Sequence, residues 1–381
     1  MSAISVRRRE RPLCLLVAGA RPNFMKVAPI IRALRVGDVG FDHRLVHTGQ
    51  HYDDEMSGVF FRELGIPEPE FSLRAGGVTQ AEQTARIMTA FERVCEQQRP
   101  ELVLVVGDVN STLACAIVAK KARTGLAHVE AGLRSRDLSM PEEINRIVTD
   151  ALADDFFVTE RSAIDNLRAE GKPESAIHFV GHTMIDNLLY QEARLEERRA
   201  LLTRSEELRH SLPRYAVLTL HRPANVDDRD RLAHLLQALG RVAREIAIVF
   251  PVHPRSARNL QQFGLTLPQG VVPVSPLSYM EFLNLWRSAS FVLTDSGGLQ
   301  EETTALGVPC LTLRDNTERP VTVEEGTNIL VGTDPELIER EASRILRGGG
   351  KRGRRPPLWD GRAAERIVPL LQRRLTAAGH D

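Results

Sequence analysis

The sequence predicts an α/β protein built from two doubly wound domains, each with a parallel sheet. Short apolar runs alternate with amphipathic helical patterns along both halves of the chain. One such run, residues 102–106, is apolar throughout, which is typical of a strand buried on both faces of a parallel sheet. A length of 381 residues is too great for one ordinary core and suits two domains. We expect the ligand site in a cleft between them.

Composition excludes several classes of protein. Hydrophobic residues make up 42% of the chain and charged residues 26%, as in a globular protein rather than a disordered one. Fifty basic residues balance fifty acidic residues, which argues against a protein that binds nucleic acid mainly through phosphate contacts. No apolar stretch has the length of a membrane span. The four cysteines lack C-x-x-C spacing, so we expect reduced core thiols and neither a zinc site nor a disulfide framework.

The N-terminus places an arginine cluster before an apolar run, as a signal peptide does. The run is short and lacks a cleavage site, so we interpret residues 13–19 as the first buried strand and expect a cytoplasmic protein. Arg21 and Lys26 flank the carboxyl end of this strand, where open α/β sheets bind ligands. The two residues are therefore candidates for binding an anion, although surface charges would give the same pattern.

Three acidic residues follow consecutive strands in the first half. Asp108 ends the strand over 102–106, where it could also cap the next helix. Glu130 follows the strand over 127–129, and Glu142 opens a helix, a position that usually complements the helix dipole. Their convergence on one sheet edge is harder to dismiss than any one of them. The other elements expected in this half are strands over 41–47, 155–159 and 177–181 and helices over 80–98, 111–122 and from about 161.

The second half repeats the alternation after a strongly charged segment. We expect one long helix over 184–209 and place the domain boundary in this region. Strands are expected over 216–220, 246–252, 271–274, 291–294, 310–313 and 329–331, with a last helix over 361–375. His221 and His253 follow two of these strands on the ligand side, although a lone histidine at such a position is more often structural.

The stretch 291–320 carries the strongest local signal. Its strand breaks at Asp295, Ser296, Gly297 and Gly298, and a helix follows. Glycines let a ligand approach the backbone, and a helix N-terminus suits a phosphate. Glu301 and Glu302 are expected in the first turn, where a carboxylate is stable and can also accept hydrogen bonds from sugar hydroxyls. A simple strand-to-helix turn would look alike.

Taken in order from about residue 13 to residue 371, the motifs resemble those of the non-hydrolysing UDP-N-acetylglucosamine 2-epimerases. They are GARPNFMKVAPI, TGQH, VVGDVNSTLA, HVEAGLRS, PEEINR, LTLHRPANV, VHP, LTDSGGLQEE, LGVPCLTLRDNTERP and GTNILVGT. The resemblance implies the GT-B architecture of two Rossmann-like domains. The first would comprise residues 1–182 and the returning helix 361–381, and the second, nucleotide-binding domain would comprise 183–360.

The resemblance also divides the candidate residues among the parts of a UDP-sugar. The residues implied for the diphosphate are Ser296, Gly297 and Gly298, with Arg21 and His221 adding positive charge. Those implied for the nucleoside are Glu302 at the ribose, Phe282 at the uracil and Arg319 in the nucleotide pocket. Those implied for the sugar are Lys26, Asp108, Glu130 and Glu142. His253 joins the substrate-binding set through its place at a strand end.

The chemistry explains the need for several acids. Carbon 2 of the sugar is not next to a carbonyl, and the chain has no G-x-G-x-x-G fingerprint for a nicotinamide, so no cofactor is expected. The family's route eliminates UDP to a glucal and adds it back with a proton delivered to the other face, which needs an acid and a base. We assign this role to Asp108, Glu130 and Glu142, and electrostatic stabilisation of the leaving diphosphate to His221.

Several residues depart from the family's motifs. Asn23 replaces an acid, Val109 a threonine, Ala224 an acid and His182 an asparagine, so the exact N-acyl sugar stays open, with a UDP-diacetamido-uronic acid among the alternatives. The resemblance also implies a homodimer and a second UDP-GlcNAc, bound as activator near Gln50 and His51.

Three rival functions remain. A hydrolysing 2-epimerase would release UDP and free ManNAc from the same nucleotide site. A GT-B glycosyltransferase would need an acceptor groove but not three acids at the sugar. A catalytically silent UDP-sugar sensor would keep residues 296–302 but could lose Asp108, Glu130 or Glu142, and all three are present.

Overall fold

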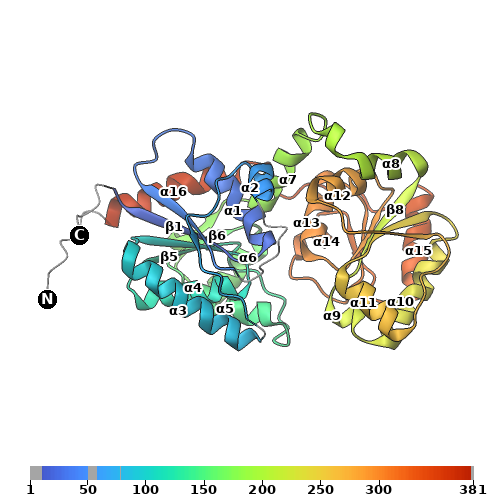
Figure 1. The fold of residues 1–381 in the computed structure, drawn as a ribbon, viewed down its shortest axis with the longest axis horizontal. Helices are drawn as coiled ribbons and strands as arrows, with labels where there is room; N and C mark the ends of the chain where they lie inside the picture. The colour runs from blue at the N-terminus through green and yellow to red at the C-terminus, as the bar shows by residue number, and fades with distance from the viewer. Residues whose placement is uncertain (1–10, 50–57, 78, 379–381) are drawn as a thin grey trace. The chain divides into compact units, whose positions relative to one another are not determined.

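The computed structural model describes residues 11–49, 58–77 and 79–378. The chain forms two compact units (Figure 1). Unit 1 comprises Met1–Asn187 and Leu358–Asp381, and unit 2 comprises Leu188–Pro357. Unit 2 is therefore inserted in the sequence of unit 1.

Among the described residues, unit 1 contains a parallel seven-stranded sheet in the order β3-β2-β1-β4-β5-β6-β7. Its strands are β1 (Leu13–Ala18), β2 (Asp42–His47), β3 (Phe71–Ser72), β4 (Leu102–Val106), β5 (Gly125–Val129), β6 (Asp155–Val158) and β7 (Ile177–Phe179). The strand order reverses between β1 and β4. In open α/β sheets the ligand binds at the carboxyl ends of the strands beside such a reversal.

Helices cover both faces of this sheet. They are α1 (Arg21–Leu34), α2 (Gly58–Leu64), α3 (Gln80–Gln98), α4 (Asn110–Lys121), α5 (Pro141–Leu152), α6 (Arg161–Ala169) and α16 (Ala363–Ala378). Neighbours α3, α4 and α5 lie along one face, while α1 packs with α16 on the other (Figure 1). Leu13 and Leu15 pack with Phe91 of α3, and Cys14 and Leu16, which alternate with them along β1, are equally buried. The predicted burial of strands on both faces is confirmed.

Unit 2 contains a second parallel sheet, with six strands in the order β10-β9-β8-β11-β12-β13 within the described part of the chain. The strands are β8 (Tyr215–Thr219), β9 (Ala247–Pro251), β10 (Val271–Val274), β11 (Val292–Thr294), β12 (Cys310–Thr312) and β13 (Asn328–Leu330). Here the order reverses between β8 and β11. The predicted class, two doubly wound α/β units, is confirmed.

The helices of unit 2 also build a buried core. They are α8 (Thr203–Ser211), α9 (Pro223–Val226), α10 (Arg229–Val242), α11 (Pro254–Phe263), α12 (Tyr279–Trp286), α13 (Gly297–Leu306), α14 (Pro320–Glu324) and α15 (Pro335–Leu346). Leu235 and Leu239 of α10 and Ile338 of α15 belong to the same core cluster as Leu218 and Phe250 of the sheet. The core thus joins the helices α10 and α15 to the strands β8 and β9.

The prediction of one long helix over 184–209 is wrong. Helix α7 (Thr183–Ala193) ends early, a short 3-10 helix occupies Arg199–Leu201, and α8 begins at Thr203. The Glu281 carboxylate on α12 accepts hydrogen bonds from the backbone N–H groups of Arg204 at 3.3 Å and Ser205 at 2.6 Å. A new helix can start there because these N–H groups have an acceptor from another helix.

The chain re-enters unit 1 against the end of β7. A Cβ atom on Gly181, whose φ is +89°, would lie 2.0 Å from the carbonyl oxygen of Leu358, so only glycine fits this close approach. Trp359 is 1% exposed and donates its Nε1–H to the carbonyl of Thr159 at 2.9 Å. Its ring meets that of His182 edge-on, with centroids 5.0 Å apart. His182, one of the departures from the family motifs, therefore packs in the interior of unit 1.

Asp186 caps the N-terminus of helix α16, which follows Trp359 in the sequence. Its carboxylate accepts hydrogen bonds from the backbone N–H groups of Ala363 at 3.1 Å and Ala364 at 2.8 Å. Burial raises the pKa of Asp186 to about 6, although these two hydrogen bonds act in the opposite direction. The folded protein therefore holds this proton more tightly than the unfolded chain does.

We expect a pH-dependent difference in stability between the native protein and Asp186→Asn. Because the folded-state pKa is raised, the stabilisation is complete below about pH 4 and is lost as the pH rises through about 6. Between these limits the native protein should lose about 3 kcal/mol relative to the variant, which cannot titrate. Urea unfolding of both proteins at about pH 4 and about pH 7.5 measures this. A difference that is the same at both pH values would contradict the assignment.

All four cysteines are buried free thiols, and burial raises the pKa of Cys14, Cys95 and Cys310 to about 12. No helix within the described ranges combines the length and the apolar character that a membrane span requires. In the same residues, no group of three or more His, Cys, Asp or Glu side chains is placed to hold a metal ion.

Candidate active site

The strand reversal in unit 1 brings Lys26 and Glu130 together. Lys26, on α1 after β1, is 5% exposed, and its Nζ lies 2.5 Å from Oε2 of Glu130, which is 3% exposed. Glu130 follows β5 with φ +72°, a left-handed conformation that costs energy for a residue with a side chain. Arg21 is the first residue of α1 and is half-buried. The edge thus holds a buried ion pair and a strained acidic residue.

Asp108 lies after β4, the strand between those of Lys26 and Glu130. Its Oδ2 is 2.5 Å from Nη1 of Arg146, and its backbone carbonyl accepts a hydrogen bond from Asn145 at 2.9 Å. The Asp108 side chain is 20% exposed, whereas the side chain of Arg146 is almost fully buried. Helix α5 therefore holds a carboxylate that remains accessible to a ligand.

The sequence interpretation missed the role of Asn145 and Arg146. Asn145 lies three residues after Glu142 and Arg146 lies four residues after it, so the two share its side of helix α5. That spacing was the available signal. Nothing local in the sequence indicates that their partner is Asp108.

Glu142 and Glu143 occupy the first turn of α5, as predicted, but they differ in environment. Glu143 accepts hydrogen bonds from the backbone N–H groups of Ser135 at 2.9 Å and Arg136 at 2.8 Å, and it pairs with Arg146 at 2.7 Å. Burial raises the pKa of Glu143, but these partners outweigh it and lower the pKa overall. Glu143 fastens the preceding loop, whereas Glu142 is only half-buried.

The strand reversal in unit 2 places His221 beside Asp295. Asp295 is buried after β11 and accepts hydrogen bonds from the backbone N–H groups of His221 at 3.0 Å and Arg222 at 2.9 Å. Its Oδ1 lies 2.9 Å from Nδ1 of His221. Burial raises the pKa of Asp295, but the hydrogen bonds and the charge of His221 lower it overall. Asp295, which sequence reasoning treated only as a turn residue, orients His221 and leaves its Nε2 for a ligand.

His253 lies next to His221, with ring centroids 5.7 Å apart. Its Nδ1 accepts a hydrogen bond from the backbone N–H of Arg255 at 3.2 Å and caps α11. Burial and the neighbouring His221 lower the pKa of His253. His253 is therefore a neutral cap that packs near the proposed diphosphate-side histidine.

Helix α13 begins at Gly297, with Ser296 as its N-cap residue. The Ser296 side chain makes no capping hydrogen bond, and the first N–H groups of a helix have no acceptor within it. A Cβ on Gly297 would lie 2.7 Å from Nη1 of Arg319, so a larger residue here would displace the Arg319 guanidinium. The expectation that Glu301 and Glu302 lie in the first turn is wrong, because the helix starts at Gly297 and both fall in its second turn.

The remaining nucleotide candidates lie around α13. Glu302 is buried and accepts a hydrogen bond from the Tyr279 hydroxyl at 2.8 Å, and Phe282 follows Tyr279 on α12. Arg319 Nε lies 2.5 Å from Glu301, and its guanidinium also pairs with Glu318. Burial raises the pKa of Glu318, but Arg319 and Arg314 hold it far below its usual range. The structure thus brings Arg319 to the start of α13 and leaves Glu302 on the side of α12.

Comparison with known proteins identifies the family. The family model described as UDP-N-acetylglucosamine 2-epimerase matches residues 35–372. The chain belongs to the UDP-N-acetylglucosamine 2-epimerase family. The enzyme of that name from Methanocaldococcus jannaschii is 40% identical over 368 residues, covering 93% of this chain and 98% of the relative. The resemblance inferred from the motifs is confirmed.

Two further comparisons bear on ligands. The crystal structure of the M. jannaschii UDP-GlcNAc 2-epimerase in complex with UDP-GlcNAc and UDP superposes with a TM-score of 0.86 at 40% identity, covering 95% of this chain and 99% of that one. A UDP-2,3-diacetamido-2,3-dideoxy-D-glucuronate 2-epimerase from Pseudomonas aeruginosa is 39% identical over 335 residues, covering 87% of this chain and 92% of the relative. Similar identity within this 2-epimerase family therefore accompanies different sugars.

The residues that depart from the family's motifs differ in how deeply they are buried. Asn23 is buried, donates to the carbonyl of Val106 at 3.0 Å and accepts from the backbone N–H of Ala20 at 3.0 Å. It therefore ties α1 to the strand ends. Val109 is the half-buried N-cap residue of α4. Gln50 and His51, the proposed activator residues of the 2-epimerase family, lie outside the described residues.

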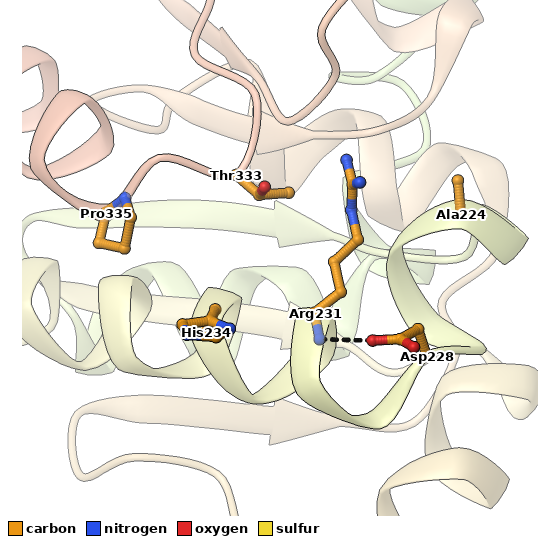
Figure 2. Close-up of a pocket in the computed structure, with 6 residues that line it drawn as sticks. All are labelled: Ala224, Asp228, Arg231, His234, Thr333 and Pro335. Atoms are coloured by element: carbon orange, nitrogen blue, oxygen red, sulfur yellow. Dashed lines mark hydrogen bonds between the residues drawn. The ribbon is translucent and has the colours of Figure 1, made fainter.

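Ala224 lines a concavity of unit 2 (Figure 2). The concavity has a volume of about 540 Å³ and is lined by Ala224, Asp228, Arg231, His234, Thr333 and Pro335. Asp228 accepts a hydrogen bond from the backbone N–H of Arg231 at 2.8 Å and so caps α10. No predicted site residue among those the structure describes lines this concavity.

Proposed function

We propose that the protein interconverts UDP-N-acetylglucosamine and UDP-N-acetylmannosamine by inverting carbon 2 without net hydrolysis. The observation that carries the proposal is the pair of carboxylates at the ends of β4 and β5, each set against a cation: Asp108 with Arg146 and Glu130 with Lys26. Membership of the 2-epimerase family supports the same reaction.

The reaction divides into an elimination and an addition. A carboxylate takes the proton from carbon 2, the bond between carbon 1 and the UDP oxygen breaks, and its electron pair leaves with UDP while a double bond forms between carbons 1 and 2. UDP then adds back at carbon 1 as a proton reaches carbon 2 from the other face. Asp108, Glu130 and Glu142 form the acid–base set for these two transfers. Lys26 balances the charge of Glu130 as the sugar loses and regains its proton.

Unit 2 holds the nucleotide in this proposal. The diphosphate binds the N–H groups at the start of α13, where Ser296, Gly297 and Gly298 lie. His221, oriented by Asp295, stabilises the negative charge on the departing diphosphate through its Nε2. Arg21 of unit 1 adds charge for the diphosphate, and Arg319, Glu302 and Phe282 contact the nucleoside.

Removing the Glu302 carboxylate should weaken UDP binding through the ribose. Glu302→Gln should raise the Kd of UDP about 10- to 100-fold, because a charged hydrogen bond contributes about 1.5–3 kcal/mol. Isothermal titration with UDP and with 2′-deoxy-UDP measures this. The deoxynucleotide should bind the native protein more weakly than UDP does, whereas the variant should scarcely distinguish the two.

Tyr279→Phe is the matched control for this prediction. It removes only the hydroxyl that donates to Glu302 at 2.8 Å and should weaken UDP binding less than Glu302→Gln does. If Glu302→Gln still discriminates between UDP and 2′-deoxy-UDP as the native protein does, Glu302 does not bind the ribose.

Proton NMR with UDP-GlcNAc in deuterated water tests the reaction. We expect UDP-ManNAc with deuterium at carbon 2 and little free UDP. Free UDP accumulating with ManNAc would assign the protein to the hydrolysing class. Unchanged UDP-GlcNAc would reject this substrate.

The relative from P. aeruginosa favours a second candidate substrate. It is named for UDP-2,3-diacetamido-2,3-dideoxy-D-glucuronate and is 39% identical to this chain, against 40% for the UDP-GlcNAc enzyme from M. jannaschii. The same NMR experiment with the diacetamido-uronate compares the two sugars. A higher kcat/KM for the uronate would make it the preferred substrate while leaving the site and the chemistry unchanged.

A further inference from the structure

His128 is a buried residue of unit 1 that has no role in the reaction proposed above. It lies on β5, completely buried, with Nδ1 2.6 Å from Oδ1 of Asp150 and Nε2 2.8 Å from the carbonyl oxygen of Gly107. A carbonyl oxygen can only accept a hydrogen bond, so Nε2 must carry a proton. If Asp150 is ionised, Nδ1 must carry one as well.

The surroundings of Asp150 keep it ionised. Its second oxygen, Oδ2, accepts from the backbone N–H of Gly132 at 3.0 Å and lies 2.8 Å from Nη2 of Arg134. Burial raises the pKa of Asp150, but His128, Arg134 and the Gly132 N–H lower it overall. Both oxygens therefore act as acceptors, which requires a doubly protonated His128 ring.

The other charged groups near His128 have partners of their own. Arg134 also pairs with Glu170 at 2.7 Å, but the Glu170 side chain is 36% exposed and in contact with solvent. At the start of β5, Lys120 and Asp154 pair with each other at 2.7 Å. Asp155 on β6 pairs with Arg374 on α16 at 3.4 Å. Within the buried cluster, Asp150 is the acid that both Arg134 and His128 contact.

The pair links the two turns that carry the candidate acids. Gly107 directly precedes Asp108, and Gly132 lies two residues after Glu130. The same helix, α5, holds Asp108 itself through Asn145 and Arg146. Contacts from one rigid helix thus set the positions of both turns.

We propose that His128 is a positioning residue held as an imidazolium between Asp150 and the Gly107 carbonyl, and that this pair fixes Asp108 relative to Glu130. The inference rests on the proposed function for its kinetic consequence, because it assigns Asp108 and Glu130 to the acid–base set. The protonation of His128 is a property of the folded protein and does not depend on which substrate is turned over.

Nitrogen-15 NMR of histidine-labelled full-length protein tests the imidazolium directly. We expect one histidine with both ring nitrogens protonated in the folded protein, and this signal should be missing in His128→Asn. If no histidine of the native protein is doubly protonated, the proposal fails. That result needs no variant, so it holds even if His128→Asn does not fold.

Kinetics with the substrate that the native protein turns over test the positioning role. His128→Asn should lower kcat about 10- to 100-fold, because small displacements of a reacting group have effects of this size. The Kd of UDP should change less than about threefold, since unit 2 is untouched. A variant with native kcat, or one in which UDP affinity and kcat fall together, overturns the proposal.

His178→Asn is the matched control. His178 lies on β7 of the same sheet, partly exposed, with Nε2 3.5 Å from Asp155. Its replacement should leave kcat unchanged, and an equal loss in both variants would attribute the effect to the sheet rather than to His128. If the native protein turns over no UDP-sugar, the proposed function fails, while the NMR result still decides the state of His128.

Discussion

Asp108→Asn should lower kcat about 10²- to 10⁴-fold, the range that a general acid or base contributes, while UDP binds almost as before. The loss is expected because asparagine keeps the shape of the side chain but can neither take the carbon 2 proton nor return one. The fold should tolerate the change, since Arg146 keeps its pairing with Glu143 at 2.7 Å. Glu142→Gln should have a similar effect, because Glu142 belongs to the same set.

Rates from the NMR assay, combined with UDP titration, measure this prediction. Asp155→Asn is the control, since Asp155 lies in the same sheet at the start of β6, the edge opposite to the site. Deuterium entering the substrate and product pools should be scored separately, because a variant lacking the base for one face loses exchange from one pool first. Near-normal epimerisation in both Asp108→Asn and Glu142→Gln would refute the assignment.

Trp359→Ala should lower the free energy of unfolding of unit 1 by about 3–5 kcal/mol, as expected when a buried aromatic side chain is truncated in a core. The variant loses the indole packing, leaves a cavity beside His182, and removes the donor to the Thr159 carbonyl. Trp359→Phe should cost less, because it loses the same hydrogen bond but keeps most of the side-chain volume.

The placement of the two tryptophans makes the measurement selective. Trp359 belongs to unit 1 and Trp286, also buried, belongs to unit 2. In Trp359→Phe the fluorescence therefore reports on unit 2 alone, while circular dichroism of Trp359→Ala in urea follows the whole chain. Unfolding of Trp359→Ala at the same urea concentration as the native protein would contradict the prediction.

The positions of the candidate residues were predictable where they follow from topology. Carboxyl ends of parallel strands share one edge of their sheet, so Asp108 and Glu130 in unit 1 and His221 in unit 2 could each be placed from the strand pattern alone. Their partners could not, because these come from distant sequence: Arg146 lies 38 residues after Asp108, and Asp295 lies 74 residues after His221.

The predicted starts of two helices were wrong for a related reason. Helix α8 begins where Glu281, 76 residues away from Ser205, supplies an acceptor. The start of α13 was misplaced because Ser-Gly-Gly fits both a turn and the first residues of a helix, and the close approach of Arg319 to Gly297 is not visible in the local sequence. Local patterns identify elements, whereas tertiary partners set their ends.

The interruption of unit 1 by unit 2 has a consequence for biosynthesis. The ribosome makes α1 before unit 2 and α16 after it, yet these two helices pack together, with Ile367 and Leu371 of α16 buried. A nascent chain that ends before Leu358 contains all of unit 2 but exposes the apolar surface that α16 will cover. Unit 1 therefore finishes folding only after α16 has emerged, and a nonsense codon between unit 2 and α16 would damage the unit whose translation began first.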